Sequence, residues 1–404
     1  MARHAGSGPT AGTHRTISGR PRRTISTWPR QAISGRPRQV ISTWPRQVIS
    51  GRPRRRSARW AVAAVAAVSL GAAACTSGTA SQAASSRRTA TPAASHGGGF
   101  GASGAAGRAT TVTVTEPSWQ LANPLSRMVV LPDGSGALAL LGGLTSADTS
   151  ADGAFRLSLA TGTLSTLGTL PSAVHDGAGA VIGGTDMVLG GGSTSTVPTV
   201  EGVPVGGGAG TVIGQLPQPR SDTSATTVGA TTVVVGGYNG TNPDPTVLST
   251  TDGTSFSTVT TLPVPVRYAA VAALGSSVYV FGGMATEGTG VGLPVATVQR
   301  VDLTTRQASI VATLPEPIEG AAAVVLGGRI FVAGGDTASP GSTATTSSAA
   351  VLAFDPASAR FTDAGTLAQA VAYAGSAVTG GAAWLVGGEH DGQVVAAVQE
   401  LRPG

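Results

Sequence analysis

Polar side chains at repeated positions form the candidate binding surface of this sequence. Some lie at, or next to, a position eight residues before a recurring turn glycine, and others follow recurring glycine pairs. Guanidinium, carboxylate, phenol and imidazole groups gathered on one face can bind a sugar or a peptide through hydrogen bonds. We expect one binding face that contains His175, Arg220, Arg267, Tyr268, Glu319, Tyr373, Tyr238, Asp336, Glu389 and His390.

Two other interpretations of these residues stay open. Arg267 and Glu319 could pair across neighbouring repeats and only satisfy the rim of a channel. Alternatively, an acid/base set on the same face could serve a glycan lyase or hydrolase, which needs paired carboxylates or a Tyr/His pair at a fixed distance. Because the sequence assigns no catalytic residue, non-catalytic binding is the leading hypothesis.

The segment Glu389-His390-Asp391 has the composition of a metal site. Three adjacent residues cannot all face one ion without help, and no second histidine lies nearby in the sequence, so we predict a solvated loop. We expect neither a metal nor a cofactor.

The candidate positions belong to a repeat whose signature is a short apolar run that ends in a glycine pair. The first glycines of the pairs stand at positions 142, 190, 236, 282, 334 and 387, in steps of 48, 46, 46, 52 and 53 residues. This period is typical of propeller blades built from short strands. In the clearest unit, the alternation of residues predicts strands at 270–274, 277–281, 297–302 and 309–314.

The repeat unit resembles the kelch repeat. Besides the glycine pair, the matching features are an Asp at the end of the third strand (Asp302, Asp355) and an aromatic or apolar residue that opens the fourth (Phe361, Ile310). The resemblance implies an all-β, six-bladed kelch-type propeller over residues 111–404. An irregular β solenoid is the alternative.

The sixth unit ends without a fourth strand of its own. We therefore expect an N-terminal strand, at Ser118–Leu125, to complete that blade and remove the open edges of the ring. One branch of the kelch family, the galactose-oxidase-like enzymes, implies a copper site with a cysteine crosslinked to tyrosine. The only cysteine here, Cys75, precedes the propeller, so the sequence departs from that branch.

The segment before the propeller has three parts. Residues 1–59 form a basic Arg/Pro arm with an octapeptide repeat, which could be translated from upstream of the true start codon. Residues 60–75 form an apolar run ending at Cys75, and residues 76–110 form a flexible linker. The apolar run with its cysteine resembles a bacterial lipoprotein signal peptide. This resemblance implies lipidation of Cys75 and a place on the outer face of the cytoplasmic membrane or in the envelope; ordinary cleavage would give a secreted protein.

The charge is divided between these regions. The chain through Cys75 carries 14 arginines and no acidic residue, whereas the rest carries 12 arginines against 20 acidic residues, a net charge of −8. An acidic folded domain argues against nucleic acid as its partner. We expect a monomeric propeller, displayed at the bacterial cell surface, that recognises protein or glycan through the loops of one face.

Overall fold

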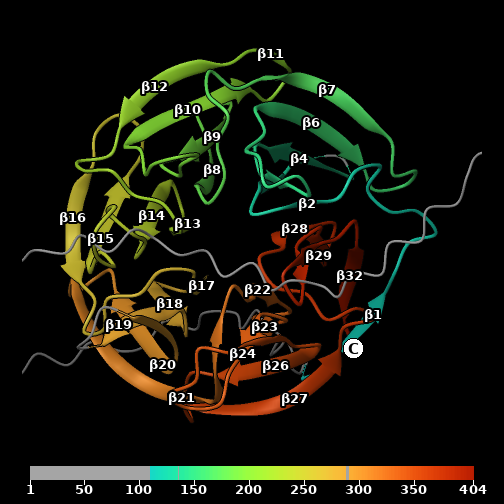
Figure 1. The fold of residues 1–404 in the computed structure, drawn as a ribbon. Coiled ribbons are helices and arrows are strands. Elements are labelled where there is room, and N and C mark those ends of the chain that lie inside the picture. Colours follow the sequence, from blue (N-terminus) through green and yellow to red (C-terminus); the bar gives the residue numbers. More distant parts are fainter. Residues whose placement is uncertain (1–109, 135, 288–290) are drawn as a thin grey trace, which may run out of the picture. The chain divides into compact units, whose positions relative to one another are not determined.

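The computed structural model describes residues 110–134, 136–287 and 291–404, and every element in them is a β-strand (Figure 1). The predictions for the basic arm (1–59), the apolar run with Cys75 (60–75) and the linker up to residue 109 lie outside the described residues. In the described part of the chain, no helix is long and apolar enough to cross a bilayer.

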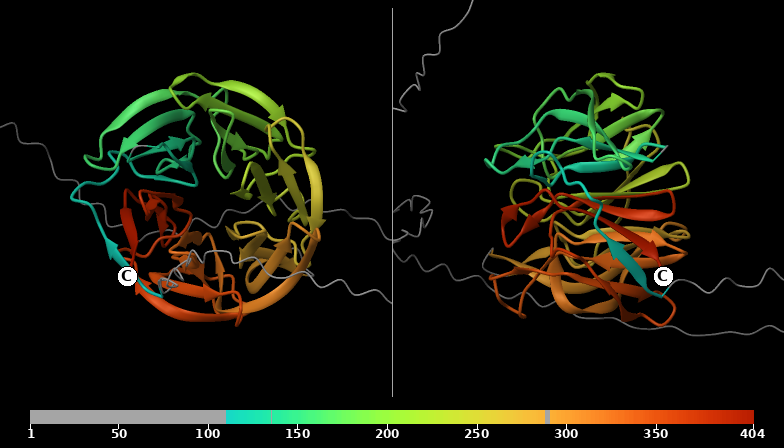
Figure 2. Two further views of the ribbon diagram at one scale, coloured as in Figure 1. Left: turned by 180° about the vertical axis from the view of Figure 1, so that it is seen from behind. Right: turned by 90° about the vertical axis from the view of Figure 1, so that its right-hand side faces the viewer.

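The strands form sheets arranged in a ring around a central axis (Figures 1 and 2). The first sheet contains β3 (Val129–Pro132), β4 (Ala137–Leu141), β6 (Gly153–Ser158), β7 (Leu164–Thr169) and β11 (Gly208–Ala209). The second contains β8 (Ala178–Ile182), β9 (Thr185–Leu189), β10 (Thr199–Pro204) and β12 (Thr211–Gln215). The third contains β13 (Ser224–Val228), β14 (Thr231–Val235), β15 (Thr246–Thr250) and β16 (Ser257–Thr261).

The second half of the ring continues in the same order. The fourth sheet contains β17 (Ala270–Leu274), β18 (Ser277–Phe281), β20 (Val291–Asp302) and β21 (Gln307–Glu319), to which β19 (Met284–Glu287), β24 (Asp336–Thr337) and β25 (Thr346–Ser347) are attached. The fifth contains β22 (Ala322–Leu326), β23 (Arg329–Ala333), β26 (Ala350–Asp355) and β27 (Arg360–Thr366). The last contains β28 (Gly375–Thr379), β29 (Ala382–Val386), β32 (Val398–Pro403) and β1 (Val112–Thr115). Two-stranded ribbons join β2 (Leu125–Ser126) to β5 (Leu144–Thr145) and β30 (Glu389–His390) to β31 (Gln393–Val394).

The strands β8, β13, β17, β22 and β28 lie nearest the axis of their sheets, and in the last sheet the order from the axis outward is β28, β29, β32 and β1 (Figure 1). The molecule is thus an all-β propeller. The strands predicted at 270–274 and 277–281 are confirmed as β17 and β18, whereas β20 and β21 are longer than predicted. All five residues of β18 are buried, because neighbouring sheets cover both of its faces.

The glycine pairs have a structural cause that recurs around the ring. In the pair Gly282-Gly283, both residues have positive φ (57° and 94°), a conformation that favours glycine. The N–H of Gly283 donates to the carbonyl oxygen of Ile318, at the entrance to the next sheet (2.7 Å), and a Cβ on Gly282 would overlap that oxygen. The equivalent hydrogen bonds run from Gly143 to Val174, Gly191 to Arg220, Gly237 to Val266, Gly335 to Val371 and Gly388 to Leu125. Each pair therefore ties one sheet to the next through backbone atoms.

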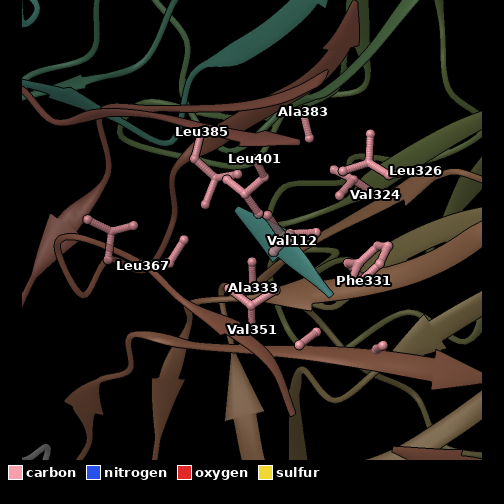
Figure 3. Packing of buried hydrophobic residues seen from close by; sticks show 14 of the residues in the cluster. Val112, Val324, Leu326, Phe331, Ala333, Val351, Leu367, Ala383, Leu385 and Leu401 are labelled. Carbon is pink, nitrogen blue, oxygen red and sulfur yellow. The ribbon is translucent and has the colours of Figure 1, made fainter. Parts of the chain in front are cut away.

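The strand beside β32 is β1, which pairs with it antiparallel from Val112↔Pro403 to Thr115↔Glu400. Val112 lies in a buried cluster with Leu401, Leu385 and Val351, between the fifth and last sheets (Figure 3). The prediction that Ser118–Leu125 is this strand was wrong. Trp119 instead packs beside the cluster that contains Trp384, and only Leu125 of that segment is in a strand, β2.

Candidate functional site

Six residues at the entrances to the innermost strands form what we call the entry ring. Each lies two residues before the innermost strand of its sheet, and each has positive φ, between 52° and 63°. The members are Arg127, Asp176, Asp222, Tyr268, Gly320 and Tyr373. Only Gly320 adopts this conformation without a steric cost, so the other five side chains are held there by their surroundings.

Backbone hydrogen bonds connect the members of the entry ring. The N–H of Arg127 donates to the carbonyl of Tyr373 (3.0 Å), which links the first sheet to the last. In the same way Asp176 donates to Arg127, Tyr268 to Asp222, Gly320 to Tyr268 and Tyr373 to Gly320, at 2.7–3.0 Å. In these five members the N–H points toward the preceding member of the ring. The backbone thus narrows one end of the central tunnel.

The residue before each ring member pairs with the residue that follows a glycine pair. These contacts are Ser126↔Leu144, His175↔Gly192, Ser221↔Tyr238, Arg267↔Met284, Glu319↔Asp336 and Ala372↔Glu389. The two groups of candidates selected from the sequence are therefore neighbours on one face, which we call the loop face.

Arg127 is the hub of the site. Its Nε donates to Oε1 of Glu389 at 2.6 Å and its Nη2 to Oε2 at 3.3 Å, so the two planar groups meet in a fork. Its Nη1 reaches Asp176 Oδ2 (3.4 Å) and the hydroxyl of Tyr268 (3.0 Å), which belongs to the fourth sheet. Ser126 also donates to Glu389, at 2.9 Å. One side chain, 17% exposed, thus joins residues from four sheets.

Two tyrosines enclose the guanidinium of Arg127. Its central carbon lies 4.1 Å from the ring centre of Tyr373 and 5.3 Å from that of Tyr268, and the two rings meet edge to face at 5.2 Å. These are cation–π distances. Burial first, and then the nearby carboxylates, raise the pKa of both phenols, so both hydroxyls remain protonated.

A second arginine completes the aromatic cluster. Arg267 forms an ion pair with Asp222 (3.2 Å), and its guanidinium lies 5.0 Å from the ring centre of Tyr238 and 5.2 Å from that of Tyr268. The predicted pairing of Arg267 with Glu319 is therefore replaced by a pairing with Asp222 in the part of the chain that the structure describes.

Two carboxyl groups of the site have strongly raised pKa values. Burial raises the pKa of Asp176 to about 7, Arg127 opposes this shift, and Asp222 adds to it. Burial and the charge of Asp336 raise the pKa of Glu319 to about 7. The Oε2 atom of Glu319 is buried and has no hydrogen-bond partner of normal geometry among the described residues, and the nearby Tyr373 hydroxyl acts on the carboxyl group by lowering its pKa. The site therefore holds carboxyl groups that can exchange a proton near neutral pH.

The histidines occupy the edge of the site. His175 Nδ1 lies 2.9 Å from the Ser150 hydroxyl and Nε2 lies 3.6 Å from Asp176, while burial and then Arg127 lower the pKa of its imidazole. His390 is exposed and contacts the carbonyl of Ala370 at 2.9 Å. Among the described residues, no group of three or more His, Cys, Asp or Glu could hold a metal ion.

Arg220 does not belong to the loop face. Its side chain, 1% exposed, forms an ion pair with Asp244 (2.7 Å) and donates to the carbonyls of Gly236 and Thr246 (2.9 Å each). Because the guanidinium is enclosed by protein, it cannot meet a ligand on the loop face. Its contacts fix the loop after a glycine pair.

Sequence reasoning missed the three charged members of the entry ring, Arg127, Asp176 and Asp222. A signal existed for Asp176 and Asp222, because each follows by one residue a position eight residues before a turn glycine, as Tyr268 and Tyr373 do. Ser126, which precedes Arg127, stands eight residues before Gly134 and so occupies the same repeat position in the first unit.

The entry ring closes the end of a tunnel lined by the first strands. A chamber of about 120 Å³ is lined by the ring members and by the residues that follow them, such as Ala269 and Ala374. It shares lining residues with a cavity of about 490 Å³ between β3, β8, β13, β17, β22 and β28. Alanine, glycine, serine and threonine predominate in that cavity, so charge is concentrated at the ring.

Sheets arranged radially around a central tunnel are the architecture of the β-propeller class, to which this chain belongs by its fold. A solved structure titled "Structure of YjhT" is similar to this chain, with a TM-score of 0.59 and 17% sequence identity over 70% of this chain and 95% of that one. A likeness at this identity shows the fold alone. No protein-family model matches the chain, and no curated protein matches it significantly.

Proposed function

We propose that this protein is a non-catalytic binding propeller that recognises the end of a glycan on its loop face, at the entry ring. The observation that carries the proposal is the position of Arg127, which lies between two tyrosine rings and two carboxylates at the closed end of the tunnel. Guanidinium and carboxylate groups offer fixed donors and acceptors for hydroxyl groups, and tyrosine rings offer faces for the C–H side of a sugar.

Glu319 and Tyr238 extend this surface. The unpaired, buried Oε2 of Glu319 can accept a hydrogen bond from a hydroxyl group, or donate one when the carboxyl is protonated. Tyr238, beneath Arg267, presents a further ring from the neighbouring loop. A protein partner recognised through the same loops is the remaining binding hypothesis.

Calorimetric titration of the full chain with a panel of mono- and disaccharides tests the proposal. We expect Arg127→Lys to weaken binding at least 10-fold, because Lys keeps the charge but loses the fork with Glu389. Arg300→Lys is the matched control, since Arg300 pairs with Asp302 on the outer part of the fourth sheet. Equal affinity in both variants, or no binding of any saccharide, would contradict a glycan site at the ring.

A second candidate function is glycan lyase or hydrolase chemistry at the same ring. The specific support is the pair of carboxyl groups with pKa values near 7, Asp176 and Glu319, with the Tyr268 hydroxyl 3.3 Å from Asp176. Turnover of polysaccharides that disappears in Asp176→Asn would favour this function. Binding of polysaccharides with no turnover between pH 5 and 8 would contradict the enzymatic function and favour the non-catalytic binding function.

We further propose that the ring has six kelch-type blades and that β1 completes the last one. Support comes from the glycine-pair bonds around the ring, including the bond from Gly388 to Leu125, and from the β1–β32 pairing. An experimental structure with another number of blades would contradict this count.

We also propose that the propeller is a monomer held at the outer face of the cytoplasmic membrane by a lipid on Cys75. The support is the sequence pattern described above. Metabolic labelling with palmitate should mark the wild-type protein and leave Cys75→Ala unlabelled; equal labelling of the two would contradict the anchor.

A further inference from the structure

A groove separate from the entry ring lies between the first sheet and the last. Its volume is about 480 Å³, which is within the range of small-molecule sites. It is lined by Pro117, Ser118, Trp119, Gly136, Leu159, Ala160, Thr379, Gly380, Trp384, Glu400 and Arg402. Gly136, Thr379 and Gly380 lie in the hairpins at the ends of β3 and β28 away from the ring. The groove therefore opens toward the hairpin face, opposite the loop face.

Both tryptophans of residues 110–404 line this groove. Trp119 lies against Gly162, where a Cβ would overlap the indole ring, so the β6–β7 hairpin supports one side of the ring. Trp384, on β29, is 7% exposed and lies opposite Glu400 in the pairing with β32. Two indole side chains from segments about 265 positions apart thus meet at one cavity, in a domain that holds only these two.

A charged pair borders the groove beside the tryptophans. Arg402 donates to Glu400 Oε1 at 2.6 Å, and Thr115 donates to Oε2 at 3.4 Å. The Arg402 side chain is 59% exposed and that of Glu400 is 14% exposed. Because Arg402 is mostly in solvent, its remaining N–H groups are free to turn toward a ligand, while Thr115 and the strand hold Glu400 in place.

We propose that this groove is a second binding site, which takes one or two neutral sugar units such as hexose or N-acetylhexosamine. The partly buried indole ring of Trp119 can pack against the apolar C–H face of a sugar, whereas Trp384 lines the groove from the buried cluster. A carboxylate beside a guanidinium can bind the sugar hydroxyl groups. The opposite charges of Glu400 and Arg402 cancel, so the groove favours an uncharged ligand over an anionic or cationic one. This inference does not depend on the function proposed for the entry ring.

Fluorine NMR of the full chain labelled with 5-fluorotryptophan tests the site residue by residue. The chain has five tryptophans, and the variants Trp119→Phe and Trp384→Phe assign the two groove signals. With cellobiose and chitobiose as probes, we expect these two signals to shift in a saturable way while the other three stay in place. Shifts of the other three alone, or no saturable shift with either probe, would overturn the proposal.

Two further variants separate this site from the entry ring. We expect Glu400→Gln combined with Trp119→Ala to weaken binding of the probe in the groove, measured by the Trp384 signal, at least 5-fold. Arg127→Lys, which alters the entry ring, should leave the saturation of the Trp384 signal unchanged. Glu316→Gln, on an exposed part of β21, is the control for a surface charge. If Arg127→Lys removes the tryptophan shifts, the shifts come from the entry ring and the groove is not a saccharide site. Lipid vesicles serve as a second probe, and tryptophan shifts that appear with vesicles but with neither disaccharide would also overturn the proposal. Unchanged circular dichroism of each variant shows that the sheet is intact.

Discussion

Arg127 and Arg220 precede the innermost strands of two different sheets, the first and the third, and they have opposite roles. Arg220 is enclosed, and its partners are Asp244 and the backbone carbonyls of Gly236 and Thr246, at the two ends of the loop between β14 and β15. Arg127 lines the chamber at the entry ring, and its partners are side chains from other sheets, of which Asp176 and Tyr268 also line that chamber. The difference teaches that a buried ion pair fixes a loop, whereas an ion pair at the tunnel end prepares a surface for a ligand.

The largest expected effect is on stability, at Arg220. Arg220→Met leaves the carboxylate of Asp244 buried without its cation, so we expect the free energy of unfolding to fall by about 3–5 kcal/mol. Urea denaturation measures this change. The double variant Arg220→Met with Asp244→Leu should recover part of the loss, because it removes the unpaired charge. If Arg220→Met lowers the free energy of unfolding by less than about 1 kcal/mol, Arg220 does not have the structural role that distinguishes it from Arg127.

The next largest expected effect is a change in the pKa of Asp176 when Arg127 is replaced. Arg127 lowers the pKa of Asp176 against the effect of burial, so Arg127→Gln should raise that pKa above its value of about 7. NMR titration of the Asp176 carboxyl carbon measures the shift, and Arg300→Gln serves as a control that should leave it unchanged. If the pKa of Asp176 is the same in Arg127→Gln as in the wild type, the two groups do not interact, and Arg127 is not the centre of the site as described.

A pH dependence of stability follows from the same carboxyl group. The pKa of Asp176 is higher in the folded protein, about 7, than the ordinary 3.8, so the folded state holds a proton that the unfolded state has lost. This contribution to stability is fully present below about pH 4 and is lost as the pH rises toward 7. Asp176→Asn, which tolerates positive φ, should lack this dependence.

Thermal unfolding from pH 4.5 to 8 checks this expectation. The melting temperature of Asp176→Asn relative to wild type should rise across the range and level off above pH 7. A constant difference between the two proteins would show that Asp176 is ionised throughout.

The smallest expected effect is at Tyr373. Tyr373→Phe keeps the ring 4.1 Å from Arg127 and removes only the hydroxyl, so stability should change by less than about 1 kcal/mol. Tyr373→Ala removes the ring and should cost more, up to about 2 kcal/mol. Equal losses in the two variants, measured by urea denaturation, would show that the hydroxyl rather than the ring supports the guanidinium.

The strands and turns of the propeller were predictable because the glycine pairs are imposed by backbone contact. Gly282 lies so close to the Ile318 carbonyl that only glycine fits, and the same close contact requires a glycine at the equivalent position of every repeat. The closing strand was harder to predict. Residues 111–115 and 118–125 both have strand character, and the choice depends on which segment pairs with β32, a contact between opposite ends of the domain.

The sequence predicted which face of the propeller carries the candidate site, but it predicted only some of the residues that form the site. Arg220 occupies the repeat position held elsewhere by Val174, Val266 and Val371, all buried, so its place in the core was readable from the register. The convergence of Arg127 on Tyr268 was not readable, because the two belong to different sheets and meet only when the ring is assembled. Side-chain direction at the entry ring depends on positive φ, which composition does not reveal in an arginine or a tyrosine.

The backbone hydrogen bonds of the entry ring can form with any of these side chains, and the side-chain contacts of Arg127 are added to them. Arginine, aspartate, tyrosine and glycine all occupy equivalent positions in this one chain. A lineage could therefore exchange these residues one at a time, and so retune what the protein recognises, without redesigning its scaffold.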